Sequence, residues 1–246
     1  MPSAKHSVAQ PIVDRLNTVF PLEERDAAAL LALPVEVAGV RADQDIVRQG
    51  DRPTQSFFLI EGFAFTYKLT GEGRRQIMSF HLPGDFPDLP SLHLPVVDNN
   101  VGTISPCKVG FIPHDALRDL CDRHPRIASA FWRETLIDAA IFREWIMNIG
   151  RREALGRMAH LLCELIARMR AVGLARGDTM ALPFTQGEVA DALGLSTVHV
   201  NRTLQELRRA DLVSWKGSTL VVRDWDGLRR AADFDPAYLH FKNGIV

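Results

Sequence analysis

Two short helical patterns joined by a glycine-containing turn constrain this chain of 246 residues more than any other feature. The stretch TQGEVADALGLSTVHVNRTLQELRRADLV, from Thr185 to Val213, places them on either side of LGLS. Ala190 is small enough to let two helices cross closely, and Gly194 suits the turn between them. Apolar residues recur at helical spacing as anchors for a core, namely Val189, Leu193, Leu195, Val200, Leu204 and Leu207. The spacing predicts a helix-turn-helix unit.

The second of these helices carries polar side chains where a buried helix would carry leucine. Ser196 precedes the helix and is suited to cap it by accepting hydrogen bonds from backbone N–H groups. Arginine fits the edge of guanine, asparagine that of adenine, and a valine or threonine methyl can contact the methyl of thymine. We therefore predict that this helix contacts DNA bases through Thr197, Val198, His199, Asn201 and Arg202. Thr185, Gln186 and Ser196 are further residues expected to bind DNA.

The segment LVSWKGSTLVV that follows is typical of two short strands around a turn, which predicts a wing beside the helices. Lys216 in that turn is expected to contact a phosphate. Residues 151–230 carry 13 basic and 9 acidic side chains, whereas residues 1–150 carry 15 and 19. A cationic carboxyl-terminal half suits a polyanionic partner, so double-stranded DNA is the expected partner. An ordinary solvated helical hairpin is the alternative.

The region from about Val35 to Pro113 has the pattern of short strands separated by turns. Aromatic and β-branched residues are mixed in it, and TGEGR has the glycines of a hairpin loop. Gly50-Asp51 and Gly84-Asp85 mark two further turns. Repeated hairpins of this length predict a small antiparallel β-barrel or jelly roll, and hence an α+β chain.

Residues Pro125 to Gly150 contain no internal proline or glycine and are predicted to form one long helix. The helix is apolar on more than one face, so it requires more than one neighbour. We expect one face to lie on the barrel and another on the same helix of a second subunit, which makes the protein a homodimer. The expected contact residues are Phe131, Leu136, Ile137, Ile141 and Trp145. A helix buried within one chain is the alternative.

The expected domain organisation follows from these segments. A β-barrel domain covers residues 1–124, the dimerisation helix residues 125–150, and the winged helix-turn-helix residues 151–230. The last of these begins with a predicted amphipathic helix over residues 151–171, whose single apolar side contains Met158, Leu161, Leu162, Leu165 and Met169. Residues 231–246 form a tail that is too short for a domain.

Residues 20 to 225 resemble the Crp/Fnr family of bacterial transcription regulators, with GDF near the end of a barrel, a long helix, the segment Thr185–Val213 and a wing. The resemblance implies a cyclic-nucleotide-binding-like barrel, a homodimer along the long helix, and a palindromic promoter site. The recognition arginine of the family falls on Arg202. Many members carry a glutamate four residues earlier, where this chain has Val198, so their half-site sequence does not transfer.

The barrel departs from the family members that bind cyclic AMP. GDF is followed by PDLPSLHLPVVDNN, and between Arg75 and Arg118 the only Lys or Arg is Lys108. Where the family's Arg-Ser pair would be sought, the sequence has Asp98 to Asn100, and Asp88 adds a further carboxylate. Neutral donors compensate a buried phosphate poorly, so cyclic nucleotides are not expected to bind. A ligand should be neutral or apolar, or lie elsewhere, for example against Trp132 and Trp145.

Other sensors are less favoured by the sequence. An iron–sulfur cluster is not expected, because residues 1–106 contain no cysteine. His81, His93 or His114 would be the candidate haem ligands. Cys107, Cys121 and Cys163 form no CxxC pair and have no basic cluster nearby, which favours structural thiols over a redox switch or a zinc site. No cofactor or metal is expected.

The remaining expectations concern the class of protein and its place in the cell. No nucleophile elbow, metal-ligand pattern or phosphate-binding loop occurs, so an enzyme is not expected. No apolar run approaches a membrane span and the amino terminus lacks a signal-peptide profile, so the cytoplasm is expected. RNA polymerase is an expected partner if the protein is an activator. A protein-interaction module that has lost DNA binding is the second alternative.

Overall fold

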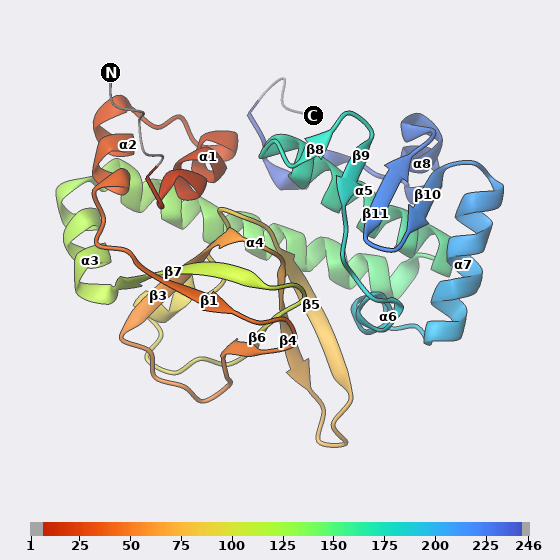
Figure 1. Cartoon of the computed structure of the whole chain (residues 1–246), viewed down its shortest axis with the longest axis horizontal. Coiled ribbons are helices and arrows are strands. Elements are labelled where there is room, and N and C mark those ends of the chain that lie inside the picture. The colour runs from red at the N-terminus through yellow and green to blue at the C-terminus, as the bar shows by residue number, and fades with distance from the viewer. Residues whose placement is uncertain (1–6, 243–246) are drawn as a thin grey trace. The chain divides into compact units, whose positions relative to one another are not determined.

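A computed structural model describes residues 7–242 of the chain, which divide into two compact units (Figure 1). The first unit contains the described residues up to Tyr67 together with Phe80–Leu136. The second contains Lys68–Ser79, a hairpin tip, and the described residues from Ile137 onwards. Each unit is described by itself.

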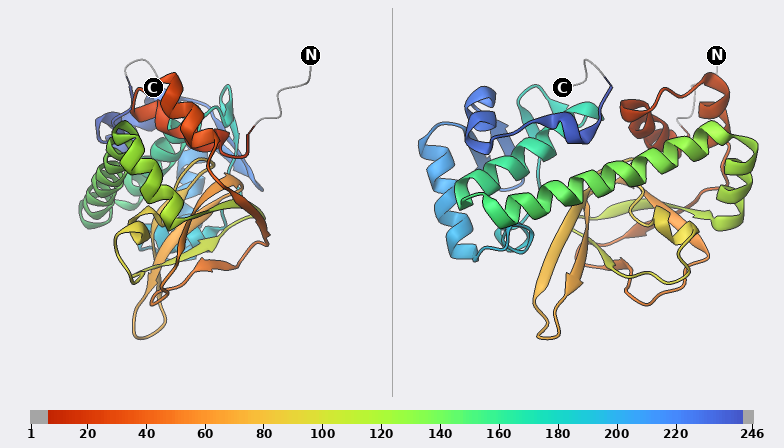
Figure 2. Two further views of the ribbon diagram at one scale, coloured as in Figure 1. Left: turned by 90° about the vertical axis from the view of Figure 1, so that its left-hand side faces the viewer. Right: turned by 180° about the vertical axis from the view of Figure 1, so that it is seen from behind.

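The first unit is built on two antiparallel sheets, with strand orders β1-β7-β3 and β2-β6-β4-β5. The strands of these sheets are β1 (Glu36–Val40), β2 (Asp45–Val47), β3 (Gln55–Glu61), β4 (Ala64–Leu69), β5 (Arg75–His81), β6 (Asn100–Thr103) and β7 (Cys107–Pro113). The end of β4 and most of β5 belong to the hairpin tip that is grouped with the second unit. Its helices are α1 (Gln10–Val19), α2 (Glu24–Leu31), the 3-10 turn η1 (Leu89–Leu92), α3 (His114–Arg123) and the start of α4 (Pro125–Arg151). The predicted barrel of hairpins and the predicted long helix are thus confirmed, and α4 is continuous (Figure 2).

Strand β3 is buried on both faces because it separates two apolar clusters. Phe57 and Leu59 face a cluster with Val101 and Val109, whereas Phe58 packs with residues of α1, α3 and α4. Each phenylalanine is fully buried, and burying such a side chain contributes about 1.5–3 kcal/mol to stability.

The GDF turn requires its glycine. Gly84 has φ +93, and a Cβ there would lie 2.5 Å from the carbonyl oxygen of Pro11 and 2.7 Å from Cβ of Arg15. Asp85 accepts a hydrogen bond of 2.8 Å from the Leu82 N–H and lies 3.0 Å from Nε of Arg15, within a buried ion pair. The turn therefore anchors helix α1 to the barrel.

The second unit surrounds helix α5 (Ala154–Ala171). Its sheet has the order β10-β11-β9-β8, formed by β8 (Ala175–Arg176), β9 (Thr179–Ala181), β10 (Val213–Lys216) and β11 (Thr219–Val222). Its other helices are α6 (Gln186–Leu193), α7 (Thr197–Arg209), α8 (Trp225–Ala232) and the 3-10 turn η2 (Pro236–Leu239).

The prediction for α5 is wrong in two respects. The helix begins at Ala154 rather than at residue 151, and it is buried all round from Met158 to Met169 rather than on one side. The physical reason is that α5 contacts α7 and α8, and that residues of the tail also pack against it, for example Phe234 and Tyr238 on His160. The tail is too short for a domain, but it completes this core.

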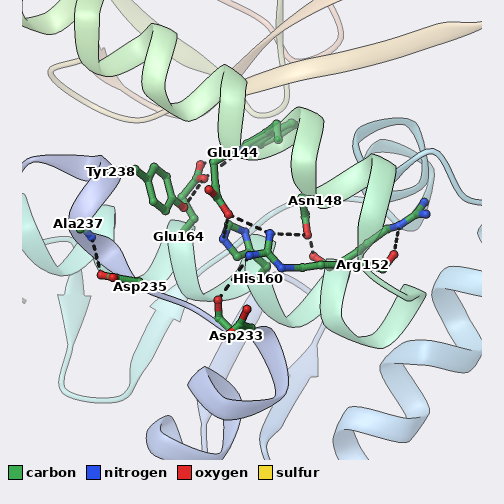
Figure 3. Close-up of polar contacts among 11 residues, drawn as sticks. Glu144, Asn148, Arg152, His160, Glu164, Asp233, Asp235, Ala237 and Tyr238 are labelled. Atoms are coloured by element: carbon green, nitrogen blue, oxygen red, sulfur yellow. Dashed lines mark hydrogen bonds and ion pairs between the residues drawn. The ribbon is translucent and has the colours of Figure 1, made fainter.

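A buried polar network joins the second half of α4 to α5 and to the tail (Figure 3). Glu164 on α5 accepts hydrogen bonds from Nε1 of Trp145 (3.1 Å) and from the hydroxyl of Tyr238 (2.8 Å). Arg152 on α4 donates to Glu144 (2.9 Å), whose carboxylate lies 3.1 Å from Nε2 of His160. Trp145, His160 and Glu164 are buried and the other members are partly buried, so loss of one of these partners would leave a polar group in the interior without compensation.

His160 makes the stability of this unit dependent on pH. Burial, and then the positive charge of Arg152, lower the pKa of His160 from 6.5 to about 3. As the pH falls below 6.5, His160 becomes protonated in the unfolded chain but stays neutral in the folded one. The free energy of unfolding that is present above pH 6.5 is therefore lost progressively toward pH 3. We expect the free energy of unfolding to fall by about 2 kcal/mol between pH 7 and pH 5 on this account.

Urea denaturation at both pH values tests this, with His160→Phe as the comparison. Phenylalanine retains an aromatic ring beside Phe234 and Tyr238 but does not titrate. The variant is expected to lose about 2 kcal/mol less than the wild type over this interval. Equal losses in the two proteins would show that His160 is not responsible.

Candidate nucleic-acid interface

The turn between α6 and α7 has the predicted geometry. Gly194 ends α6 with φ 63, and the N–H of Leu195 donates to the carbonyl of Ala190 over 3.1 Å. The hydroxyl of Ser196 then caps α7 by accepting a 3.2 Å hydrogen bond from the His199 N–H. Ala190 is buried, as the small residue at a close approach should be. The helix-turn-helix prediction is confirmed.

The start of α6 is stabilised by a capping box that was not foreseen. The hydroxyl of Thr185 accepts from the Glu188 N–H (3.2 Å), and the Glu188 carboxylate accepts from the Thr185 N–H (2.6 Å). The spacing T-x-x-E before an apolar segment was the available signal. The Thr185 hydroxyl, which we predicted to contact DNA, also donates to Glu188 and so already bonds within the chain.

Most of the side chains that we predicted to bind DNA are exposed on α7 and at the start of α6. Thr197, Asn201 and Arg202 are exposed, Val198 is 78% exposed, and His199 is half-buried. Nδ2 of Asn201 lies 3.4 Å from Oε1 of Gln186, so these two side chains meet between the helices. An exposed valine on an otherwise polar face is unusual in a solvated helix and fits contact with an apolar group of a partner.

The face of α7 that points away from the core extends beyond the predicted residues. Val200, Thr203, Leu204 and Leu207 are buried and define the opposite face. At about 100° per residue, the centre of the free face is then occupied by Val198, Arg202, Gln205 and Arg209. We missed Gln205 and Arg209, although their spacing of three and seven residues from Arg202 places them on the same side.

The wing is fixed against α7. Strands β10 and β11 pair as a hairpin whose turn includes Gly217, with φ 55, and Lys216 beside it is exposed. The guanidinium of Arg208 on α7 donates to the carbonyl of Trp215, and Nε1 of Trp215 donates to the carbonyl of Leu182 (3.2 Å). The position of Lys216 is thus set by buried contacts rather than by a free loop.

The tip of the β4–β5 hairpin also holds α6. Nε of Arg75 lies 2.7 Å from Oδ2 of Asp191, and Nε2 of Gln76 donates to the carbonyl of Ala192 over 3.2 Å. On α5, Arg157 donates to the carbonyl of Leu193 (3.2 Å). The sequence pattern gave no signal for these contacts, because the partners are more than thirty residues apart.

The surface of α4 corrects the residues that we expected at a subunit contact. Phe131, Ile137, Ile141 and Trp145 are buried within the single chain and therefore cannot form its exposed face, and only Leu136, 52% exposed, is available. The apolar character of the five predicted residues indicates that they are buried. It does not show whether the chain itself or a second subunit covers them.

Three of the five large apolar side chains that α4 exposes lie in one regularly spaced row, whereas Phe142 and Met147, each 39% exposed, lie beside it. Trp132 is 69% exposed and Ile146 is 72% exposed. With Leu136, Ala139 and Arg143 they repeat at alternating intervals of four and three residues. This spacing is typical of a helix that packs along a second helix.

The candidate sensor residues are engaged in structural contacts. Nε2 of His81 lies 2.7 Å from Oγ1 of Thr66, and Nε2 of His114 lies 3.1 Å from Oγ of Ser91, whereas His93 is exposed. Burial raises the pKa of all three thiols, for Cys163 to about 12, so none is an activated thiolate at neutral pH. Within residues 7–242 no group of three His, Cys, Asp or Glu side chains is placed to hold a metal ion.

One electrostatic expectation is wrong. We counted Asp88 as an anion that repels phosphate, but burial raises its pKa from 3.8 to about 8, so it is mainly protonated at pH 7. Lys108 is half-exposed and lies 3.7 Å from Glu61.

Comparison with known proteins places these features in a family. The Crp-like helix-turn-helix domain matches residues 156–231, and the cyclic nucleotide-binding domain matches residues 39–124. The chain belongs to the Crp/Fnr family of bacterial transcription regulators. It therefore carries the DNA-binding helix-turn-helix domain of these regulators, and its homologues are transcription regulators rather than enzymes.

The similar members of the Crp/Fnr family cover most of the chain. The anaerobic regulatory protein of Haemophilus influenzae is 25% identical over 219 residues, 88% of this chain and 84% of that protein. The transcriptional activator protein FnrL of Cereibacter sphaeroides is 27% identical over 200 residues, 79% of each chain. The structure of FixK2 from Bradyrhizobium japonicum superposes with a TM-score of 0.73 at 27% identity, over 81% of this chain and 98% of that one.

In the part of the chain that the structure describes, no helix is both long and apolar enough to cross a bilayer.

Proposed function

We propose that this Crp/Fnr regulator is a sequence-specific transcription regulator that acts as a homodimer on a palindromic promoter site in the bacterial cytoplasm. The observation that carries the proposal is the free face of α7, where Arg202, Asn201 and Val198 are exposed. The helix is capped at its start by Ser196 and is held near its end by the hydrogen bond from Arg208 to the wing. A rigid helix with these side chains at its amino-terminal end suits the major groove.

The proposed roles follow from the chemistry of each side chain. Arg202 would donate two hydrogen bonds to a guanine, and Asn201 would pair with an adenine. Val198 would rest on a thymine methyl, and Thr197 and His199 would complete the contact. Lys216 in the wing, with Gln186 at the start of α6, would bind backbone phosphates and set the register. Arg209 extends the same face and adds a positive charge.

The dimer is proposed to form along the exposed face of α4. Trp132, Leu136 and Ile146 together expose apolar surface that a monomer would leave in water. Burying one such side chain contributes about 1.5–3 kcal/mol, and a two-fold axis doubles the number of contacts. Two recognition helices related by that axis would bind two half-sites of opposite orientation, which is the physical reason for a palindromic target.

A gel-shift experiment with fragmented genomic DNA tests the proposal. A small subset of fragments should be retarded at about 150 mM salt in the presence of excess unrelated DNA, because base contacts survive where phosphate contacts alone are competed away. Retardation of all fragments alike, or of none, would contradict sequence-specific binding and favour an interaction module. If the protein activates transcription, RNA polymerase is a further partner.

The regulator is also proposed not to respond to cyclic AMP or cyclic GMP. Residues 98–100 have the sequence DNN where a guanidinium would be needed to bind the phosphate of the nucleotide. The ammonium of Lys108 lies at the surface, 3.7 Å from the carboxylate of Glu61. A phosphate in a partly dry pocket without such a donor is poorly compensated.

Titration calorimetry with either nucleotide is expected to show no saturable binding tighter than about 100 μM, which corresponds to roughly 5–6 kcal/mol. Tighter binding together with a change in DNA affinity would show that a cation from another segment holds the phosphate. The haem-responsive and redox-responsive alternatives are less favoured, because His81 and His114 are hydrogen-bonded, Cys107 and Cys163 are buried, and the pKa of the half-buried Cys121 thiol is raised by burial and by Asp122.

A further inference from the structure

The carboxyl end of α4 and the turn of the helix-turn-helix approach each other closely in the second unit. A Cβ atom at Gly194, in the turn between α6 and α7, would lie 3.7 Å from Cγ2 of Ile149 in the last turn of α4. That distance is an ordinary van der Waals contact. The turn that orients α7 therefore packs beside the helix that carries the proposed subunit contact.

One guanidinium, that of Arg157 on α5, donates hydrogen bonds to both of these segments. Its Nε donates to the carbonyl of Arg152, at the carboxyl end of α4, over 2.7 Å. Its Nη1 donates to the carbonyl of Leu193, the last residue of α6, over 3.2 Å. The carbonyl of Arg157 in turn accepts from Nδ2 of Asn148 on α4 over 3.3 Å. Arg157 thus joins the two helix ends directly.

The two carbonyls suit a guanidinium because each lies at the carboxyl end of a helix. Main-chain acceptors there have no intrahelical donor, and this end of a helix carries a partial negative charge. A guanidinium has a positive charge and several donors in a fixed planar fork, so it can bond two such carbonyls at once. Among residues 7–242 no carboxylate forms an ion pair with Arg157, so its charge is directed at these helix ends.

The same end of α6 has a second contact that does not involve α4. Nε2 of Gln76, in the tip of the β4–β5 hairpin, donates to the carbonyl of Ala192 over 3.2 Å. Its other hydrogen bond is to the carbonyl of the neighbouring Ile77. Gln76 and Arg157 therefore both stabilise the end of α6, but only Arg157 ties it to α4.

The attachment of α6 and α7 to α4 decides where a dimer places its two recognition helices. In the proposed dimer the two chains meet along α4, so the separation of the two α7 helices depends on how each is held against its own α4. One added base pair between two half-sites moves one of them by about 3.4 Å along the DNA and turns it by about 35°. A firm attachment therefore makes the dimer sensitive to the spacing of its half-sites.

We propose that Arg157 is a positioning residue that fixes the helix-turn-helix against α4 and thereby sets the half-site spacing that the dimer accepts. Arg157 acts through α6 and α7 and is not expected to contact DNA itself. The inference rests on the proposed function, because half-site spacing has a meaning only for a dimer on an inverted repeat. Without the two hydrogen bonds, α6 and α7 can take several orientations against α4, and altered spacings become acceptable.

Fluorescence anisotropy with a series of DNA spacings tests this role in the full-length protein. The probe is the genomic fragment that is retarded most strongly in the gel shift, together with versions in which one or two base pairs are inserted or removed at its centre. For the wild type we expect one added base pair to weaken binding at least about 30-fold. For Arg157→Gln and Arg157→Lys we expect a penalty below about five-fold, because lysine retains the charge but lacks the forked donors.

The ratio of the affinities for two spacings separates positioning from stability. A variant that is partly unfolded binds every DNA more weakly by the same factor, so its ratio stays that of the wild type. Gln76→Ala is the matched control, since it removes a hydrogen bond to the same end of α6 but none to α4. It should keep the spacing penalty of the wild type within about two-fold.

The outcomes distinguish this inference from the proposed function. A spacing penalty that is the same in the wild type and in both Arg157 variants would overturn the role of Arg157 and leave the palindromic dimer in place. A relaxed ratio in Gln76→Ala would also overturn it, because any loosening of α6 would then suffice. A wild type that binds all spacings alike would contradict the palindromic dimer and, with it, this inference. If Arg157→Gln does not fold, Arg157→Lys decides the question.

Discussion

The variant Arg202→Ala is expected to lose about 1–3 kcal/mol of binding free energy in each half-site, and hence about 2–6 kcal/mol for a dimer on a palindromic site. The reason is that an exposed guanidinium at the centre of the free face of α7 would make two hydrogen bonds to one base. Equilibrium titration of labelled DNA by fluorescence anisotropy measures this loss. Discrimination between the matching and a mismatched base at that position should also disappear.

Lys216→Ala is the control for that experiment. Lys216 is exposed in the wing and is proposed to contact a phosphate, so its removal should weaken all sequences alike and lower the slope of log affinity against log salt by about 1 per half-site. The contrast between the two variants is the test. If both reduce specific and non-specific binding by the same factor, Arg202 binds a phosphate and does not read a base.

The double variant Leu136→Glu/Ile146→Glu is expected to convert the protein to a monomer. Both side chains are more than half exposed on the repeating face of α4, and the change removes about 1.5–3 kcal/mol for each buried side chain while it places four carboxylates against each other in the dimer. We expect the dissociation constant of the dimer to rise by at least about 10⁴-fold. Light scattering at micromolar protein should then give the mass of one chain, 27.5 kDa.

Phe142→Glu is the matched control on the same helix. Phe142 is also partly exposed, at 39%, but it lies about 80° from Trp132 around the helix axis, at the margin of the repeating face and one turn before Ile146. This variant should weaken the dimer far less than the double variant does. A monomeric wild type, or a double variant that stays dimeric, would contradict the proposed contact along α4.

The helix-turn-helix was predictable because its geometry depends on a few residues close together in sequence. Gly194 is needed for the left-handed turn, Ser196 for the cap, and Ala190 for the close approach, and all three have the expected roles. The strands around the TGEGR loop were predictable for the same reason, since hairpins are local.

The residues available for the proposed subunit contact could not be predicted, because burial is a property of the folded chain. The spacing in α4 shows that several faces are apolar, but only the structure shows that Phe131 and Trp145 are covered by the chain itself, with Trp145 hydrogen-bonded to Glu164. The tail was underestimated for a similar reason. Tyr238 contacts residues 74 positions earlier, and nothing in its immediate sequence indicates this.

Asp88 shows a third kind of limit. A carboxylate in a Gly-Asp-rich turn segment was counted as a negative charge, whereas its burial makes it neutral at pH 7. The protonation state of Asp88 changes its chemistry, because a protonated carboxyl group can donate a hydrogen bond whereas an ionised carboxylate repels acceptors. Local charge counts therefore describe exposed segments better than buried ones.

A genome-wide map of the DNA bound by the protein in its host cell tests most directly whether it is a dimeric, sequence-specific regulator. We predict a shared inverted repeat whose two half-sites are centred about one helical turn, roughly 10 base pairs, or a multiple of it, apart, with occupancy lost in Arg202→Ala. Bound regions that share no motif, or a motif consisting of one unpaired half-site, would contradict the proposal.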